Sequence, residues 1–95
     1  CSRHYWTPAF IKKQIDMMAH FKLNRLHLHM VDGAGWRIQV DSYPLLTQKT
    51  AYRTSSDWNK WWIGGERTYC ESNVPGAYGG FYTKQELRDN IKLLC

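Results

Sequence analysis

The chain has 95 residues, a net charge of +5 and a hydrophobic fraction of 43%. It contains no uninterrupted apolar run of about 18 residues, which excludes a transmembrane helix within this sequence. Its basic residues are scattered, with Lys12-Lys13 as the one adjacent pair, so the charge pattern does not indicate a surface that tracks nucleic-acid phosphates.

The length allows one small domain at most, and a core of this size is marginally stable alone. The chain begins at Cys1 without a methionine, and it ends at Cys95 inside an apolar helical pattern without a glycine or proline stop. We therefore expect residues 1–95 to be part of one domain, truncated at both ends. The three cysteines are an odd number without C-x-x-C spacing, which argues against a structural zinc site and a disulfide framework.

The first predicted helix covers about residues 8–22. Thr7 is a typical N-cap, and Pro8 is favoured at the first helical position. Apolar residues then recur at helical spacing between polar ones. This stripe consists of Phe10, Ile11, Ile15, Met18, Ala19 and Phe21.

The segment after this helix alternates with the two-residue period of a β-strand up to Val31. In a barrel, Leu26, Leu28 and Met30 suit the layer that faces the helices, which directs the intervening histidines toward the lumen. Because Arg3-His4-Tyr5-Trp6 fits the end of an earlier strand, the chain begins as a βαβ unit with parallel strands.

About fifty residues without a long periodic element follow, from Asp32 to Tyr82. A bare loop of that length is uncommon in a compact domain, so we expect local structure inside it. The sequence favours an extended piece at 36–40, a turn at Tyr43-Pro44 and a tryptophan-rich excursion at 57–66.

A second helix begins after Thr83, because threonine at the N-cap with Glu86 three residues later forms a capping box. Its apolar face is predicted to hold Leu87, Ile91, Leu94 and Cys95.

The order of elements indicates the α/β class. We predict a fragment of a TIM (β/α)₈ barrel, about its first two βα units, with a long elaborated loop after the second strand. The alternative is an open doubly wound sheet, but no G-x-G-x-x-G turn follows either strand.

Two charged residues at the ends of the predicted strands are candidates for a site. Arg3 can form forked, charge-assisted hydrogen bonds with ligand oxygens, and the alternative is a surface salt bridge. Asp32 can orient a histidine, bind substrate hydroxyls or set the pKa of a second carboxyl group. The alternative for Asp32 is a turn residue that stabilises the step to Gly33.

The remaining candidates are histidines and tryptophans. His27 and His29 have the spacing of a metal pair, but no further ligand completes one, so interior packing is favoured and no metal is predicted. Trp36 either walls a pocket or caps the barrel mouth. The cluster of Trp58, Trp61 and Trp62 either stacks on sugars or packs the long loop, and packing is slightly favoured.

Taken in order, these motifs resemble the first part of the catalytic domain of family 20 glycoside hydrolases, the β-N-acetylhexosaminidases. Barrels of this family open with a strand ending in Asp-x-x-Arg-His, and its aspartate would fall just before Cys1. Many members continue with Asp-Asp-Gln-Gly-Trp-Arg, so this chain lacks the second carboxylate and the amide of that turn. The matching segments are Ser2-Arg3-His4, 8–21, Lys22-Leu23-Asn24, 27–32, Gly35-Trp36-Arg37 and Gly79-Gly80-Phe81-Tyr82-Thr83.

The resemblance implies a fragment of an enzyme that removes terminal non-reducing N-acetylhexosamine from glycans. In that family the 2-acetamido oxygen of the sugar attacks the anomeric carbon and forms an oxazolinium intermediate, a substrate-assisted, retaining mechanism. The arginine matching Arg3 binds hydroxyls of the terminal sugar. The aspartate matching Asp32 belongs to a relay through a later histidine to the catalytic acid. We predict His29 and Trp36 as supporting residues.

The family's Asp-Glu pair, which orients the acetamido group and protonates the leaving oxygen, is absent, so we expect the 95 residues alone to be inactive. No cofactor is predicted, and the resemblance suggests a periplasmic or secreted bacterial protein. Two alternatives remain: a carbohydrate-binding barrel of the same family without catalysis, and a basic, aromatic nucleic-acid module. The sequence does not predict the oligomeric state.

Overall fold

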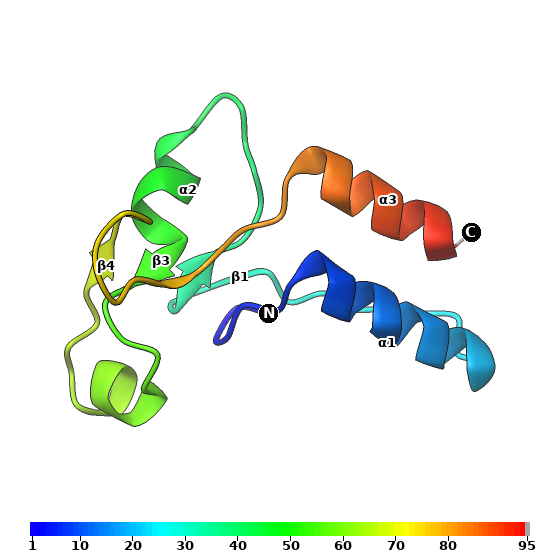
Figure 1. The fold of residues 1–95 in the computed structure, drawn as a ribbon, viewed down its shortest axis with the longest axis horizontal. Coiled ribbons are helices and arrows are strands. Elements are labelled where there is room, and N and C mark those ends of the chain that lie inside the picture. The colour runs from blue at the N-terminus through cyan, green and yellow to red at the C-terminus, as the bar shows by residue number, and fades with distance from the viewer. Residues whose placement is uncertain (95) are drawn as a thin grey trace.

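A computed structural model describes residues 1–94 of the chain. Two helices lie side by side at one end, and short strands with two short helices form the other end (Figure 1). No helix among the described residues is long and apolar enough to cross a membrane. The elements are α1 (Pro8–His20), β1 (Val31–Asp32), β2 (Gly35–Trp36), α2 (Leu45–Thr50), β3 (Tyr52–Arg53), the π-helix η1 (Asn59–Ile63), β4 (Tyr69–Cys70), β5 (Tyr78–Gly79) and α3 (Lys84–Leu94).

Helix α1 begins where the sequence predicts and ends at His20, two residues before the predicted end. The Thr7 hydroxyl accepts a hydrogen bond from the backbone N–H of Phe10 at 3.3 Å, and Pro8 occupies the first turn. Lys22, with a positive φ of 58°, turns the chain away after the last helical residue. Ile11 and Ile15 are the buried residues of the apolar stripe.

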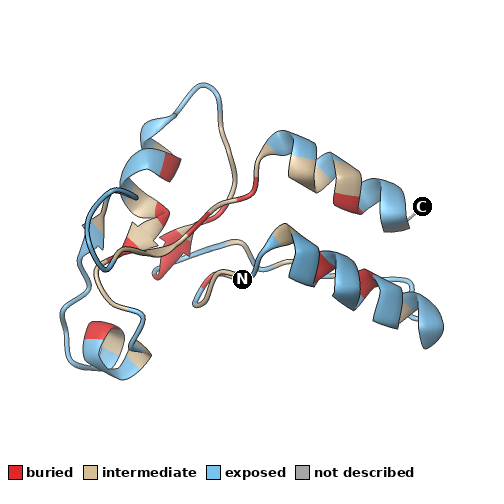
Figure 2. Cartoon of the chain, in the orientation of Figure 1, coloured by how far each residue is buried: buried red, intermediate tan, exposed pale blue. Residues whose placement is uncertain are grey.

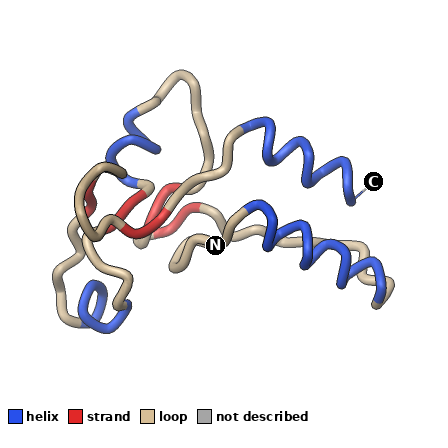
Figure 3. The backbone as a smooth tube through the Cα atoms, viewed as in Figure 1, coloured by secondary structure: helices blue, strands red, loops and turns tan. Residues whose placement is uncertain are grey.

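The segment that follows α1 is extended, but it is not a paired strand. Leu26, Leu28 and Met30 pack against the cluster around Ile11 and Ile15, so the helix-facing layer is as predicted. No strand among residues 1–94 pairs with residues 26–30, which are drawn as loop in Figure 3, whereas Val31 belongs to β1. The predicted strand over 26–31 is therefore correct about which side chains face α1. It is wrong about hydrogen bonding over 26–30, because a parallel strand needs neighbouring strands on its edges.

The chain then forms an antiparallel hairpin instead of running straight into a loop. Strands β1 and β2 pair Val31 with Trp36 and Asp32 with Gly35. Further along, residues 38 and 82 form a parallel bridge, and Tyr82 donates its backbone N–H to the carbonyl of Arg37 at 2.7 Å. The extended piece predicted at 36–40 is thus present, and it lies against the start of α3.

The predicted long loop holds more structure than its sequence indicated. Strand β3 is the centre of a three-stranded antiparallel sheet with β4 and β5 on its two sides. Helix α2 precedes this sheet, directly after the turn around Tyr43 and Pro44. The tryptophan-rich excursion forms η1, which is followed by the return to β4.

Helix α3 begins with the predicted capping box. Thr83 and Glu86 exchange backbone-to-side-chain hydrogen bonds, each 3.2 Å long. Leu87 packs on the α1 core, whereas Ile91 is 58% exposed. The predicted contributions of the Leu94 side chain and of Cys95 to the apolar face lie outside the described residues.

Buried residues lie along the strands and on the two long helices (Figure 2). The helix side has an apolar cluster of Ile11, Ile15 and Tyr82, and it also buries the polar side chain of Asn90 in α3. The strand side buries charged groups, because two of its fully buried large side chains are arginines, Arg37 and Arg53. Buried guanidinium groups require partners, and those partners define the site below.

Candidate functional site

Two of the residues predicted to bind or tune a substrate lie on the same cavity. Its volume is about 200 Å³, and it is open to solvent. Its lining comes from the N-terminal segment, from the β1–β2 hairpin, called the hairpin floor below, and from η1 with the residue before it, called the aromatic wall. The lining residues are Arg3, Asp32, Gly33, Ala34, Trp58 and Trp62.

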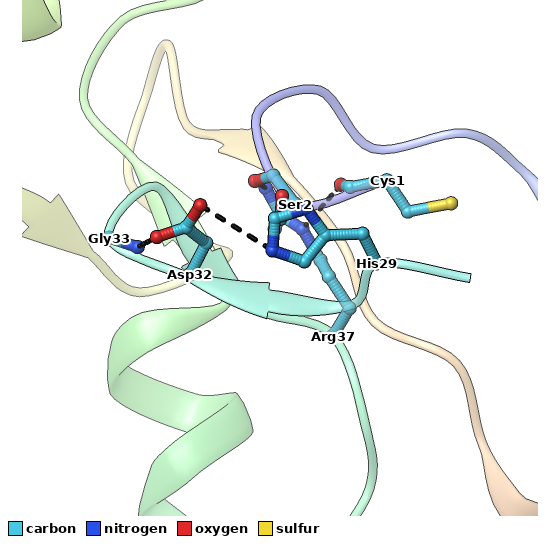
Figure 4. A network of polar contacts seen from close by, with 6 residues as sticks. All are labelled: Cys1, Ser2, His29, Asp32, Gly33 and Arg37. Atoms are coloured by element: carbon cyan, nitrogen blue, oxygen red, sulfur yellow. Dashed lines mark hydrogen bonds and ion pairs between the residues drawn. The ribbon is translucent and has the colours of Figure 1, made fainter. Parts of the chain in front are cut away.

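Asp32 is held at the tip of the hairpin by two contacts (Figure 4). Its Oδ1 accepts the backbone N–H of Gly33 at 2.7 Å, and its Oδ2 lies 3.5 Å from Nε2 of His29. The turn-stabilising contact and the orientation of a histidine, posed as alternatives by the sequence, are both present. Both side chains are about half exposed, so the carboxylate remains accessible from the cavity.

Arg3 points its guanidinium group toward the aromatic wall. Its Cζ lies 5.8 Å from the centre of the Trp58 ring. The side chain is exposed, and none of the ion pairs among residues 1–94 includes it. The guanidinium donors are therefore available to a ligand, and the surface salt bridge considered for Arg3 is not formed within the described part of the chain.

The tryptophan cluster divides between packing and pocket. Trp61 is fully buried, and its indole N–H donates to the carbonyl of Thr68 at 2.8 Å. Trp58 and Trp62 are half-buried and stack on each other, with ring centres 5.5 Å apart and planes 10° apart. Trp61 thus packs the loop, as one of the two alternatives expects, and Trp58 and Trp62 line the cavity.

The hairpin floor fits closely against this wall because Gly33 has no side chain. A Cβ atom added at Gly33 would lie 3.2 Å from Cη2 of Trp62, a contact tighter than side chains normally make. Tyr69 of β4 also donates its hydroxyl to the carbonyl of Gly33. The turn that carries Asp32 is therefore fixed against the loop on two sides.

Arg37 joins the segments behind the hairpin (Figure 4). Its guanidinium donates to the carbonyls of Cys1 at 3.2 Å and of Ser2 at 3.1 Å, which ties the N-terminal segment to β2. It also donates to the carbonyls of Ala51 and Gly80, the latter at 3.0 Å. Burial, and secondarily the charge of Arg53, lowers the pKa of Arg37 below its ordinary value.

Glycines make the space that Arg37 occupies. A Cβ atom at Gly35 would lie 2.6 Å from Cζ of Arg37, and one at Gly79 would lie 3.0 Å from its Nη1. The spacing Gly35-Trp36-Arg37 thus has a steric reason, because the glycine admits the guanidinium group beside the hairpin.

His4 completes the aromatic surroundings of the arginines. Its Nδ1 is hydrogen-bonded to the hydroxyl of Tyr78 at 2.9 Å, and its ring lies 6.1 Å from that of Trp58. Burial, followed by the positive charges of Arg53 and Arg37, lowers the pKa of His4 below its ordinary value. This shift favours the neutral imidazole of His4, which adds no charge to this cationic region.

The other predicted residues lie at the margin. His27 and His29 are both exposed, so the predicted interior packing of these histidines is not present within residues 1–94, although His29 reaches Asp32. No group of three potential metal ligands gathers within these residues. Trp36 donates its indole N–H to the carbonyl of Ile38 at 2.6 Å and does not line the cavity. Sequence reasoning missed Arg53, because an arginine inside a fifty-residue irregular stretch carries no local signal of burial.

Comparisons with known proteins agree along nearly the whole chain. The family model described as "Glycosyl hydrolase family 20, catalytic domain" matches residues 1–92. A beta-hexosaminidase of Akkermansia muciniphila is 39% identical over 90 residues, and one of Porphyromonas gingivalis is 36% identical over 90 residues. These alignments cover 95% of this chain, but 15% and 9% of the two relatives.

Solved structures give the same result. A GH20 exo-β-N-acetylglucosaminidase from Vibrio harveyi, in complex with N-acetylglucosamine, superposes with a TM-score of 0.77 at 34% identity. The match covers 99% of this chain and 14% of that one. A mutant Streptomyces plicatus β-hexosaminidase in complex with its product gives a TM-score of 0.66 at 34% identity, over 98% of this chain and 15% of that chain. The chain thus spans a small part of the length of each protein it matches.

Proposed function

The chain belongs to glycosyl hydrolase family 20, and we propose that it forms the first two βα units of the TIM barrel of a larger β-N-acetylhexosaminidase. The small share of each relative that it covers supports its being part of a longer catalytic domain, with residues 1–95 as one segment of that domain. The substrate class proposed is a glycan with a terminal non-reducing N-acetylhexosamine.

The observation that carries this proposal is the cavity shared by Arg3, Asp32 and the Trp58–Trp62 pair. A guanidinium and a carboxylate beside aromatic rings suit a sugar, since its hydroxyls need charged hydrogen-bonding partners and its C–H faces pack on aromatic surfaces. In this proposal Arg3 binds sugar hydroxyls. Asp32, with His29 beside it, belongs to the hydrogen-bonded relay that leads to the catalytic acid.

We propose the retaining, substrate-assisted reaction for the full-length protein. The 2-acetamido oxygen attacks the anomeric carbon, the bond to the leaving oxygen breaks, and an acid outside residues 1–95 protonates that oxygen. Water then opens the oxazolinium ring and restores the acetamido group. Within this chain, Arg3 holds the sugar, and Asp32 sets the pKa of the distant acid through the relay.

The test of this function is hydrolysis of a chromogenic β-N-acetylglucosaminide by the full-length protein. We expect turnover with release of the β-anomer. The anomer is identified by ¹H NMR of the freshly formed product. A protein that binds N-acetylglucosamine but gives no turnover would instead favour the non-catalytic carbohydrate-binding barrel, and release of the α-anomer would contradict retention.

The 95-residue chain alone is expected to give no measurable turnover of the same substrate. The reason is that it contains no adjacent Asp-Glu pair to orient the acetamido group and protonate the leaving oxygen. Purified chain is assayed beside the full-length enzyme at equal molar concentration. Turnover that co-purifies with the chain would show that its own residues suffice.

Replacing Asp32 with asparagine in the full-length enzyme is expected to move the alkaline limb of the kcat/KM profile to lower pH. A carboxylate coupled to the acid through the relay raises the pKa of that acid, so its removal lowers the pKa, and the protonated acid is lost at a pH lower by about one unit. The matched control is Asp41→Asn, which removes an exposed carboxylate paired with Lys84. Superimposable profiles for Asp32→Asn and wild type would remove Asp32 from the relay.

A further inference from the structure

Arg53 makes a direct contact with the main chain of the proposed substrate ligand. Its Nη1 donates to the carbonyl of Arg3 at 2.5 Å. Its Nε donates to the carbonyl of Ser55 at 2.7 Å, and its Nη2 lies 3.4 Å from the carbonyl of Ser56. The guanidinium fork thereby joins the N-terminal segment, where Arg3 lies, to the start of the tryptophan-rich loop.

A second contact runs through an aromatic ring. The Cζ of Arg53 lies 5.4 Å from the centre of the Trp58 ring, the same ring that lies 5.8 Å from Cζ of Arg3. The guanidinium also lies 4.8 Å from the ring of Tyr78 and 5.4 Å from that of Trp61. Arg53 therefore holds the backbone of Arg3 directly, and it holds the ring beside the Arg3 side chain.

Arg53 itself does not reach the ligand space. It is fully buried and is not among the residues that line the cavity. None of the ion pairs within residues 1–94 includes it, so carbonyls and aromatic rings balance its charge there. Burying a charge in this way is costly, and burial lowers the pKa of Arg53 below its ordinary value. The contacts that offset this cost are the ones that fix Arg3 and the loop.

We propose that Arg53 is a positioning residue, which sets the place and direction of the Arg3 guanidinium in the sugar site. This inference rests on the proposed function, because it requires Arg3 to bind the substrate. Arg53 acts chiefly through the Arg3 side chain in this scheme, with a smaller effect through the Trp58 ring, so most of its contribution to catalysis disappears when the Arg3 side chain is removed.

A double-mutant cycle in the full-length enzyme tests the proposal. Arg53→Lys keeps the charge but replaces the three nitrogen donors of the guanidinium with one. The backbone of Arg3 is then held less firmly. We expect a fall in kcat/KM of about tenfold, equivalent to one misplaced charge-assisted hydrogen bond. In the Arg3→Ala background the same change is expected to alter kcat/KM less than twofold.

The matched control is Arg67→Lys. Arg67 also lies over a cavity tryptophan, with Cζ 4.3 Å from the centre of the Trp62 ring, but it is exposed and contacts no part of Arg3 in the described hydrogen bonds. Its kcat/KM is expected to stay within twofold of wild type. If Arg53→Lys does not fold, Arg53→Gln retains an amide NH₂ group as hydrogen-bond donor without burying a charge and enters the same cycle.

The outcomes separate this inference from the proposed function. Equal losses from Arg53→Lys with and without the Arg3 side chain would overturn positioning and assign Arg53 a general structural role. An Arg3→Ala enzyme with normal kcat/KM would overturn both, since Arg3 would not be a substrate ligand. Loss that depends on the Arg3 side chain, with an unchanged melting temperature, supports Arg53 as the residue that positions it.

Discussion

Arg3→Ala in the full-length enzyme is expected to lower kcat/KM for a chromogenic β-N-acetylglucosaminide on the order of 100-fold. The guanidinium is exposed at the cavity without an ion pair in the described chain, so its donors are free for sugar hydroxyls. Losing two hydrogen bonds to a charged group costs about 3 kcal/mol, which corresponds to this factor.

How the loss of kcat/KM divides between kcat and KM shows whether the Arg3 contact acts in the ground state or in the transition state. A contact equally strong in ground and transition states raises KM, whereas one that strengthens in the transition state lowers kcat. Arg88→Ala is the control, because Arg88 is an exposed arginine of α3 and does not line the cavity. A normal kcat/KM for Arg3→Ala with an intact fold would refute its role as a substrate ligand.

The helices of this fold were predictable because their signals are local. Thr7 with Pro8, and Thr83 with Glu86, are short capping patterns whose hydrogen bonds form within four residues, and the structure contains both. The layer that packs on α1 was predictable for the same reason, since a two-residue alternation depends only on neighbouring residues.

The pairing of strands was not predictable from this sequence. The alternation over 26–31 fixes which side chains face α1, but it cannot supply the neighbouring strands that a ladder requires. Likewise, the sheet of β3, β4 and β5 joins two-residue strands, which are too short to show a period. Contacts distant in sequence decided both features.

For the site, the sequence identified the charged residues but not what holds them. Arg3 and Asp32 stand out because each is a charge at a predicted strand end, and the structure places both on one cavity. The roles of Arg37 and Arg53 depend on carbonyls up to fifty positions away, which no spacing rule reveals. Trp58 was left between two interpretations, because stacking on a ligand and packing a loop use the same residue type.

Arg37→Met is expected to destabilise the full-length protein by roughly 3–5 kcal/mol, seen as a lower melting temperature. Two effects oppose each other at this position. Methionine removes the cost of burying a charge, which alone would stabilise the fold. It also leaves carbonyls at Cys1, Ser2 and Gly80, among others, without their donors, at about 1–3 kcal/mol for each buried group.

The second effect dominates because Arg37 donates to several carbonyls from segments that are distant in the sequence. Arg37→Lys should fall between wild type and Arg37→Met, since it retains the charge and one nitrogen. Arg67→Met, at an exposed arginine, should change stability by less than about 1 kcal/mol. An Arg37→Met protein that melts at or above the wild-type temperature would mean that desolvation of the guanidinium outweighs its hydrogen bonds.

Hydrogen exchange at the hairpin of β1 and β2 provides the local readout, because loss of the Arg37 hydrogen bonds exposes the backbone of the turn that carries Asp32.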